Sequence, residues 1–314
     1  MTDDGPPWIG TDLLTRTVPV GDAIAVIRDE LLGGLDVTAD PQRSSLPLDN
    51  GEMLLMPSLA GESVGVKIVT VAPGNPSVGL PRISAVYVLF DPTTLEVRAL
   101  FDGNGLTALR TPAVSAVAVD ALATPDASRL LVFGTGPQAL GHVQAIRAVR
   151  PVAHVEVVGR NAQSAARFVE RCRGMGVDSS VGSVDSVAES EIIACCTSSA
   201  DPLFDGHDVP PSACVIAMGS HSPDHRELDE HLMGAADVVV EERATALREA
   251  GDVIQAIRLG ALAEGDLAEL TSVIRREPDP SPTRPRVFKG VGMAWQDRAV
   301  AAACWSRLPD DRRG

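Results

Sequence analysis

The stretch from Arg129 to Gly141 constrains the fold of this chain more than any other. Its sequence, RLLVFGTGPQALG, runs from apolar residues into a glycine turn and then into a helical pattern. A buried strand, a tight turn and a helix N-terminus in this order present free backbone N–H groups to a pyrophosphate. The G-x-G-x-x-A turn alone is weak, but a second strand-like run at 154–158 supplies the expected β-α-β context. We therefore predict a dinucleotide-binding module, with these residues at the cofactor: Gly134, Gly136, Pro137, Gln138 and Ala139.

The rest of the pattern indicates two different sheets. Strand-like runs at 129–133, 154–158, 191–195, 213–217 and 237–241 alternate with helical patterns, which predicts a doubly wound parallel sheet of the Rossmann type with ligands at the carboxyl ends of its strands. Before them, a helical pattern at 22–32 precedes strand-like runs at 52–56, 65–71, 83–90 and 97–101. Consecutive strands without intervening helices indicate an antiparallel or mixed sheet, and therefore a second, α+β domain.

A helical pattern between these two regions, at 106–123, contains a candidate start signal. Thr111 is a favourable N-cap residue and Pro112 suits the first helical position, so the main helix is predicted to begin there. Arg110 and Thr111 would then lie beside a positive helix end. That position suits an anion, either a substrate carboxylate or the phosphates of the cofactor.

Composition excludes several classes of partner. With 27 basic and 42 acidic residues, the net charge of −15 disfavours nucleic acid or an anionic membrane as the main partner. The five cysteines show no C-x-x-C pair and suit reduced thiols in a cytoplasmic protein. No apolar run reaches membrane-spanning length, and the first residues lack a signal-peptide pattern, so we expect a cytoplasmic location.

Seven segments together resemble the ornithine cyclodeaminase/mu-crystallin family. They are Arg43, GVKIVTV around Lys67, PGNP at 73–76, LFDGNGLTALRTPAVSAVA, GTGPQA, GSHSPDHREL and VFKGVGMAWQD. The resemblance spans nearly the whole chain and implies a substrate-binding and dimerisation domain at 1–120 with 293–314. It also implies an NAD(P)-binding Rossmann domain at 121–292, a homodimer, and hydride exchange at the α-carbon of an amino or imino acid.

The resemblance implies that Arg43, Lys67 and Arg110 bind the substrate carboxylate. Arginine matches a carboxylate with two parallel N–H groups, and lysine adds a point charge. Taken singly, each residue is compatible with a solvated surface charge. Lys67 argues against that alternative, because it lies inside the apolar run Val66-Lys67-Ile68-Val69, where an unpaired ammonium is costly.

The end of the second Rossmann strand bears on the choice of cofactor. An Asp or Glu there usually binds the ribose hydroxyls of NAD, but this chain has Gly159-Arg160-Asn161. Arg160 can instead bind a 2′-phosphate, with Asn161 beside it at the cofactor, so NADP(H) is favoured and NAD(H) stays open. The family pattern implies further cofactor contacts from Cys196, Thr197, Ser198, Met218, Gly219, Lys289 and Gly290. Trp295 and Asp297 are interpreted as structural residues of the last helix.

One departure from the family pattern bears on the reaction. Cyclodeaminases have an aspartate where this chain has His221, and a histidine is a poor partner for the second ammonium of ornithine. His221 is either a proton donor beside the nicotinamide or a turn residue. We reject a metal site at His221, His225 and His231, because Pro223 interrupts any helical spacing and no fourth ligand is evident.

Together these observations favour an NAD(P)H-dependent reductase of cyclic ketimines or α-imino acids such as Δ1-pyrroline-2-carboxylate. Three alternatives stay open. They are an alanine or other amino-acid dehydrogenase, an ornithine cyclodeaminase, and a non-catalytic NADPH-binding protein.

Overall fold

The computed structural model describes residues 5–59, 63–275 and 283–310 of the 314-residue chain. The chain forms two compact units. One consists of Met1–Thr111 with Met293–Gly314, and the other of Pro112–Gly292. The chain therefore crosses between the units twice, once inside a helix and once just before the last helix.

The first unit is built on a six-stranded sheet with strand order β1-β6-β5-β4-β3-β2. Strands β2 to β6 form an antiparallel meander, and the short β1 pairs with β6 in parallel. The predicted mixed sheet is confirmed, whereas β1, α1 and β2 were not predicted. The elements of this unit are β1 (Trp8–Ile9), α1 (Thr11–Thr17), α2 (Val20–Leu32), β2 (Ser44–Leu48), β3 (Gly51–Ser58), β4 (Val64–Val71), η1 (Asn75–Val78), β5 (Ile83–Phe90), β6 (Val97–Asp102) and α10 (Ala294–Arg307).

Alternation along the strands gives this sheet two different faces. On β3 and β4, the buried side chains of Leu54, Met56, Val69 and Val71 form one apolar cluster with Ala294 of α10 packed against it. The residues between them are only partly buried, as expected when successive side chains point to opposite sides of a strand. Lys67 lies on the buried face, one pleat from Val69.

Helix α3 (Gly103–Leu122) corrects the prediction of a helix start at Thr111. The helix begins eight residues earlier, because Asp102 caps it by accepting hydrogen bonds from the N–H groups of Asn104 (3.0 Å) and Gly105 (3.2 Å). Pro112 lies inside the helix, although proline offers no N–H to the preceding turn. Burial of nearly every side chain from Leu109 onward outweighs that loss. Arg110 and Thr111 are therefore interior residues of α3, and their predicted place at a positive helix end is wrong.

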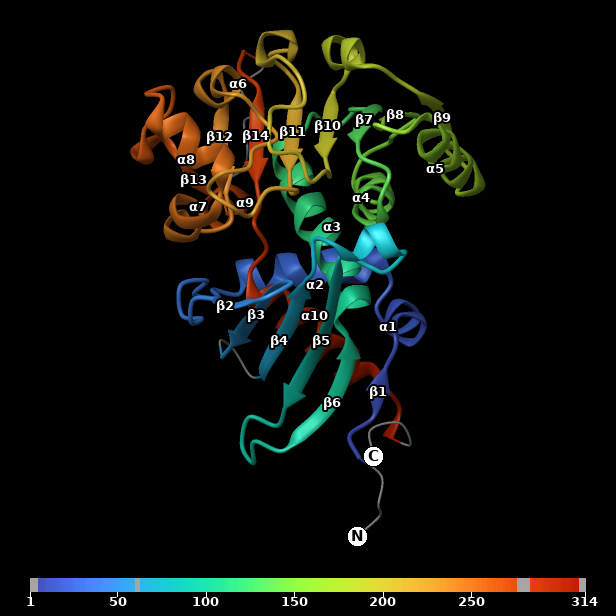
Figure 1. Ribbon diagram of the computed structural model, residues 1–314, viewed down its shortest axis with the longest axis vertical. Helices are drawn as coiled ribbons and strands as arrows, with labels where there is room; N and C mark the ends of the chain where they lie inside the picture. The colour runs from blue at the N-terminus through green and yellow to red at the C-terminus, as the bar shows by residue number, and fades with distance from the viewer. Residues whose placement is uncertain (1–4, 60–62, 276–282, 311–314) are drawn as a thin grey trace. The chain divides into compact units, whose positions relative to one another are not determined.

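The second unit is a Rossmann-type α/β domain, as predicted (Figure 1). Its eight-stranded parallel sheet has the order β13-β12-β14-β11-β10-β7-β8-β9. The five predicted strands are confirmed to within one residue at each end, and β9, β13 and β14 are additional. The elements are β7 (Arg129–Phe133), α4 (Pro137–Arg147), β8 (His154–Val158), α5 (Ala162–Gly174), β9 (Asp178–Val181), η2 (Val184–Glu189), β10 (Ile192–Cys195), η3 (Gly206–Asp208), β11 (Cys214–Ala217), α6 (Glu230–Ala235), β12 (Asp237–Val240), α7 (Arg243–Glu249), α8 (Gly251–Arg258), η4 (Glu264–Asp266), β13 (Ala268–Glu269), α9 (Leu270–Ile274) and β14 (Arg286–Lys289).

The strand order places the point where the chain reverses direction between β7 and β10. From β7 the chain proceeds outward through β8 and β9, then returns to the other side of β7 with β10, β11 and β14. In open α/β sheets, ligands bind outside the carboxyl ends of the strands at such a point. The glycine turn at 134–136 follows β7, and Cys196 follows β10, so both lie at this edge of the sheet.

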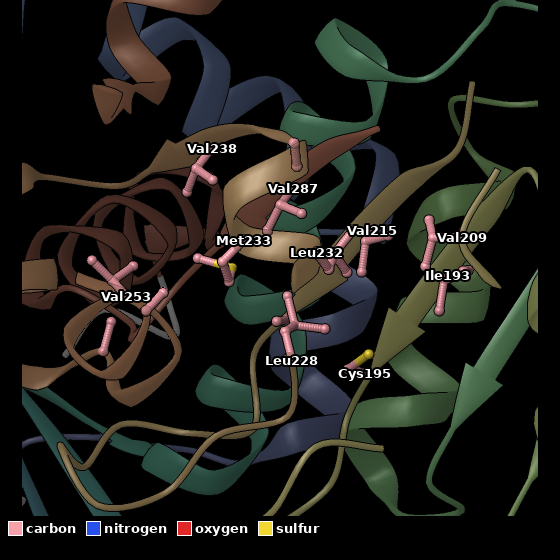
Figure 2. Close-up of a cluster of buried hydrophobic side chains, with 14 of the residues drawn as sticks. Ile193, Cys195, Val209, Val215, Leu228, Leu232, Met233, Val238, Val253 and Val287 are labelled. Carbon is pink, nitrogen blue, oxygen red and sulfur yellow. The ribbon is translucent and has the colours of Figure 1, made fainter. Parts of the chain in front are cut away.

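The core of the second unit consists of the central strands and the helices packed on them. Figure 2 shows Ile193, Cys195, Val215, Val238 and Val287 from the strands beside Leu232, Met233 and Val253 from α6 and α8. Strands β10 and β11 are buried at every position, which is typical of parallel strands covered on both faces. In the described part of the chain, none of the helices combines the length and hydropathy needed to cross a membrane.

Candidate active site

A buried charge cluster in the first unit brings together two of the predicted carboxylate-binding residues. Lys67 on β4 and Arg110 on α3 both contact the carboxylate of Asp297 on α10, which is fully buried. The Lys67 Nζ lies 2.7 Å from Asp297 Oδ2, and the Arg110 Nε lies 3.3 Å from Oδ1. Arg110 also donates to Gln296 Oε1 at 2.9 Å, and Lys67 donates to the Thr107 hydroxyl at 3.3 Å.

The environment of Lys67 makes its ammonium group costly. Burial and the positive charges of Arg110 and Arg43 together lower the pKa of Lys67 to about 8, while Asp297 opposes them. Arg43 itself is partly exposed, in the segment just before β2. All three predicted cations thus belong to one electrostatic neighbourhood, within which Lys67 and Arg110 share a carboxylate.

The stoichiometry of this cluster indicates what it can bind. One carboxylate, Asp297, faces the two cations Lys67 and Arg110, so the cluster keeps an excess positive charge. An anionic ligand with planar oxygens, such as a carboxylate, complements an arginine fork and an ammonium. Sequence reasoning treated Asp297 as structural. The sequence signal for Asp297 was a single acid in the first turn of a predicted helix, and the structure shows that this helix is mostly buried.

The glycine turn after β7 has the geometry of a dinucleotide-binding turn. Gly134 has a φ of +111°, and a Cβ at this position would lie 2.5 Å from the Cys196 carbonyl oxygen, so only glycine fits. Gly136 is the N-cap of α4, Pro137 is its first residue, and space around Gly136 is open. The backbone amides of Gln138 and Ala139 follow in the first turn, where the helix dipole favours a phosphate. These residues fit a dinucleotide.

Two further strands bring predicted cofactor residues to the same edge. Thr197 follows β10 and Gly219 follows β11. The two segments approach each other so closely that a Cβ on Gly219 would lie 1.9 Å from the Thr197 carbonyl oxygen. A Cβ on Gly290, after β14, would lie 2.4 Å from the Met218 sulfur. Glycine at both positions allows this close approach. Ser198 is exposed, whereas burial raises the pKa of the Cys196 thiol, which argues against a nucleophilic role for that cysteine.

The end of β8 presents Arg160 to solvent. Gly159 approaches the nucleotide turn, because its Cβ would lie 2.8 Å from the Thr135 side chain. Asn161 caps α5 by accepting a hydrogen bond from the Ser164 N–H at 2.9 Å. Arg160 lies between them in the sequence and is exposed, so its guanidinium is accessible from solvent.

The loop between β11 and α6 carries His221, whose side chain is exposed. Lys289 of β14 is fully buried behind this loop, with its Nζ 2.9 Å from Asp252 Oδ2 and 2.7 Å from the Ser220 carbonyl oxygen. Its ammonium is thus engaged by the protein. In the described part of the chain, no group of three or more His, Cys, Asp or Glu side chains is arranged to hold a metal ion.

Comparison with known proteins identifies relatives across almost the whole chain. The sequence model of the "Ornithine cyclodeaminase/mu-crystallin family" matches residues 20–311. A Delta(1)-pyrroline-2-carboxylate reductase of Bacillus cereus is 36% identical over 278 residues, which is 84% of each chain. The ketimine reductase mu-crystallin of Mus musculus is 34% identical over 267 residues, covering 83% of this chain and 82% of its own.

A solved structure resembles this fold closely. The Thermococcus litoralis Delta(1)-pyrroline-2-carboxylate reductase in complex with NADH and L-proline superimposes with a TM-score of 0.89 and 26% sequence identity. The match covers 96% of this chain and 97% of that one.

Proposed function

The chain belongs to the ornithine cyclodeaminase/mu-crystallin family, and from this premise we propose that it is an NAD(P)H-dependent reductase of cyclic ketimines and related α-imino acids. The observation that carries the proposal is the buried cluster of Lys67, Arg110 and Asp297, with its excess positive charge. The relatives named above include two reductases of C=N bonds, and the similar solved structure holds NADH and L-proline. Δ1-Pyrroline-2-carboxylate is therefore the first substrate to test.

In the proposed mechanism, the protein holds a substrate that has a carboxylate next to its imine carbon. Lys67 and Arg110 bind that carboxylate, with Arg43 adding positive charge, and so orient the imine carbon. The nicotinamide, when bound, supplies a hydride to this carbon. The imine nitrogen takes up a proton, so C=N becomes CH–NH, and the candidates for the donor are His221 and an ordered water. Below the lowered pKa of Lys67, its ammonium is available to the substrate.

For the cofactor, we propose NADP(H) as the preferred dinucleotide. The turn 134–139 would hold the pyrophosphate, and the exposed Arg160 would pair with the 2′-phosphate. No Asp or Glu occupies positions 159–161 to bind the ribose hydroxyls of NAD(H). Thr197, Ser198, Met218 and Gly219 would line the same edge of the sheet.

The test is oxidation of NADPH and of NADH by the purified protein with five- and six-membered cyclic imino acids, with and without ammonia. Ammonia-independent turnover that is faster at low NADPH than at low NADH is the expected result. A strict need for ammonia would instead identify an amino-acid dehydrogenase, and ammonia release from ornithine a cyclodeaminase. Tight NADPH binding without turnover of any of these compounds would contradict the enzymatic proposal.

We also propose that the first unit binds the substrate and forms a homodimer, while the second unit binds the dinucleotide. The sheet of the first unit has a second face, opposite the Val69 side, that is apolar and partly exposed. Its central residues lie in register across the strands as Leu55, Ile68 and Val86, and as Pro57, Val66, Val88 and Leu100. A flat apolar sheet face of this kind suits the same face of a second copy. Light scattering should give twice the chain mass, and Ile68→Lys should give the monomer.

We propose a cytoplasmic location from the cysteine chemistry. All five thiols are free, and Cys172, Cys195, Cys214 and Cys304 are buried. Free thiols persist in a reducing compartment.

A further inference from the structure

The second unit contains a buried acid, Glu227, that is bonded to two of the segments at the carboxyl edge of the sheet. Its side chain is fully buried. One carboxylate oxygen accepts hydrogen bonds from the backbone N–H (2.8 Å) and the hydroxyl (2.7 Å) of Thr197. The other accepts a hydrogen bond from the Gly219 N–H at 2.7 Å. A single carboxylate thus joins the segment after β10 to the segment after β11.

Two more buried charges hold Glu227 in place. Asp252 of α8 accepts hydrogen bonds from the N–H groups of Glu227 (2.7 Å) and Leu228 (2.8 Å). The other oxygen of Asp252 lies 2.9 Å from the ammonium of Lys289, which in turn donates to the Ser220 carbonyl oxygen. The three side chains therefore connect β14, α8 and the β11 segment in one continuous buried cluster.

The cluster leaves little freedom to the backbone that it holds. The Gly219 Cα faces the Thr197 carbonyl oxygen and the Glu227 carboxylate, and neither leaves room for a side chain. A Cβ on Gly251, next to Asp252, would lie 2.0 Å from the His225 carbonyl oxygen and 2.6 Å from that of Ser222, so this position also has no room for a side chain. Buried carboxylates hydrogen-bonded to N–H groups are strong, directional contacts, so this backbone is fixed before a ligand arrives.

We propose that Glu227, held by Asp252 and Lys289, is a positioning residue for dinucleotide binding. It does not contact the cofactor. It acts through Thr197 and Gly219, because it fixes their backbone at the carboxyl edge of the sheet. The glycine turn that follows β7 lies at the same edge. This inference rests on the proposed function insofar as that edge binds a nicotinamide dinucleotide. Fixing these segments in advance spares the ordering cost that binding otherwise includes.

The chain contains a matched control at the opposite end of the sheet. Glu191 immediately precedes β10 and accepts hydrogen bonds from the N–H of Ser128 (2.9 Å), the N–H of Arg129 (2.9 Å) and the Ser128 hydroxyl (3.2 Å). Like Glu227, it accepts hydrogen bonds from two N–H groups and one hydroxyl, although all three reach one oxygen, Oε2, and its side chain is only partly buried. It does so at the amino ends of β7 and β10, away from the proposed dinucleotide site.

The experiment compares Glu227→Gln with Glu191→Gln in the full-length protein. Dissociation constants for NADPH and NADH are measured by titration of the cofactor fluorescence, and melting temperatures are measured alongside. In E227Q an amide NH₂ faces either the Gly219 N–H or the two Thr197 donors, so dinucleotide binding should weaken by about tenfold, the loss of one charge-assisted hydrogen bond. In E191Q the melting temperature should fall with binding unchanged.

Binding of E227Q within twofold of the wild type would overturn the inference, as would an equal loss in E191Q. If E227Q does not fold, Asp252→Asn takes its place, because asparagine still accepts from the Glu227 and Leu228 N–H groups and loses only the ion pair with Lys289. The same direction of effect is expected. A wild-type protein that binds NADPH without reducing imino acids would refute the proposed reaction and leave this test intact. Failure to bind either dinucleotide would refute both.

Discussion

The two units of this chain each bury a cluster of three charged side chains, with opposite excess charge. In the first unit, Lys67 and Arg110 share the carboxylate of Asp297, and positive charge is in excess. In the second unit, Asp252 pairs with the ammonium of Lys289, Glu227 feels the same positive charge at longer range, and negative charge is in excess. The contacts differ as well. The acids of the second cluster accept five hydrogen bonds from backbone N–H groups and the Thr197 hydroxyl, whereas Asp297 contacts the two cations.

This difference separates a cluster that supports structure from one that we propose binds a ligand. Excess charge inside a protein is costly unless hydrogen bonds or opposite charges compensate it. In the second unit burial raises the pKa of Glu227, and Lys289 and the fixed Thr197 donors of the chain oppose that rise. In the first unit burial and two neighbouring arginines lower the pKa of Lys67 to about 8, and Asp297 opposes them. An anionic substrate would compensate that excess, so the positive charge of Lys67 and Arg110 remains available to bind a substrate carboxylate.

The largest effect on the melting temperature is expected in the Lys289 cluster, which supports the structure of the second unit. Lys289→Met leaves Asp252 and Glu227 as two buried acids without their cation. Breaking a buried ion pair from one side costs about 3–5 kcal/mol, which lowers the melting temperature by on the order of 10 °C. Differential scanning calorimetry measures it. The double variant Lys289→Met/Asp252→Asn removes the acid that was paired with Lys289 and should recover a large part of the loss. An additive, still larger loss would contradict the ion-pair interpretation.

The counterpart in the first unit should behave in the opposite way. Lys67→Met removes a costly ammonium and leaves Asp297 paired with Arg110, so the melting temperature should not fall. The value of kcat/KM for the imino acid should drop by about 100- to 1,000-fold, because a buried charge that faces the substrate carboxylate is lost. The dissociation constant for NADPH should not change. A drop in stability as large as that of Lys289→Met would abolish the distinction between the clusters.

Much of the fold was predictable from local pattern, because strands and helices bury residues with periods that the sequence displays. The parallel strands β7, β10, β11 and β12 are mainly short apolar runs, whereas β3, β4 and the edge-side strand β8 alternate. Strand β14 was missed because Arg286 and Lys289 at its ends interrupt the apolar run, although both are buried. The start of α3 was predicted wrongly from Pro112, because the Asp102 cap and tertiary burial outweigh the usual effect of proline on a helix.

The candidate site was predictable only in part, because pairing across the fold has no local signal. The family resemblance indicated Lys67 and Arg110, but the partner of both is Asp297, which is 230 and 187 residues away in the sequence. Glu227 is 30 residues from Thr197 in the sequence, and no local pattern indicates this pairing. Lys289 was predicted at the cofactor, and only the tertiary structure shows that Asp252 holds its ammonium.

A subtler change tests whether Asp297 keeps Lys67 charged. The pKa of Lys67 is already lowered to about 8, and Asp297 is the group that raises it against burial, Arg110 and Arg43. Asp297→Asn should therefore lower the pKa of Lys67 further. Substrate binding needs the protonated amine, so kcat/KM falls as pH rises through this pKa, and the fall should begin at lower pH in D297N. Profiles of kcat/KM against pH, recorded for the wild type and D297N with the same substrate, measure this shift. Any titration of the substrate itself is the same in both profiles and cancels in the comparison. Superimposable profiles would refute the role of Asp297.

The smallest effect concerns the neutral partner of Lys67. Thr107 accepts a hydrogen bond from the Lys67 Nζ at 3.3 Å, and Thr107→Val removes this acceptor while keeping the shape of the side chain. One net hydrogen bond is worth about 0.5–1.5 kcal/mol, so kcat/KM for the imino acid should fall by about two- to tenfold. Ser115→Ala is the control on the same helix, since Ser115 forms a buried hydrogen bond with His142 at 2.9 Å. If the comparison is right, T107V loses activity and little stability, whereas S115A loses stability and little affinity for the imino acid. The reverse pattern would mean that the Lys67 cluster supports the fold and does not hold charge in reserve for a substrate.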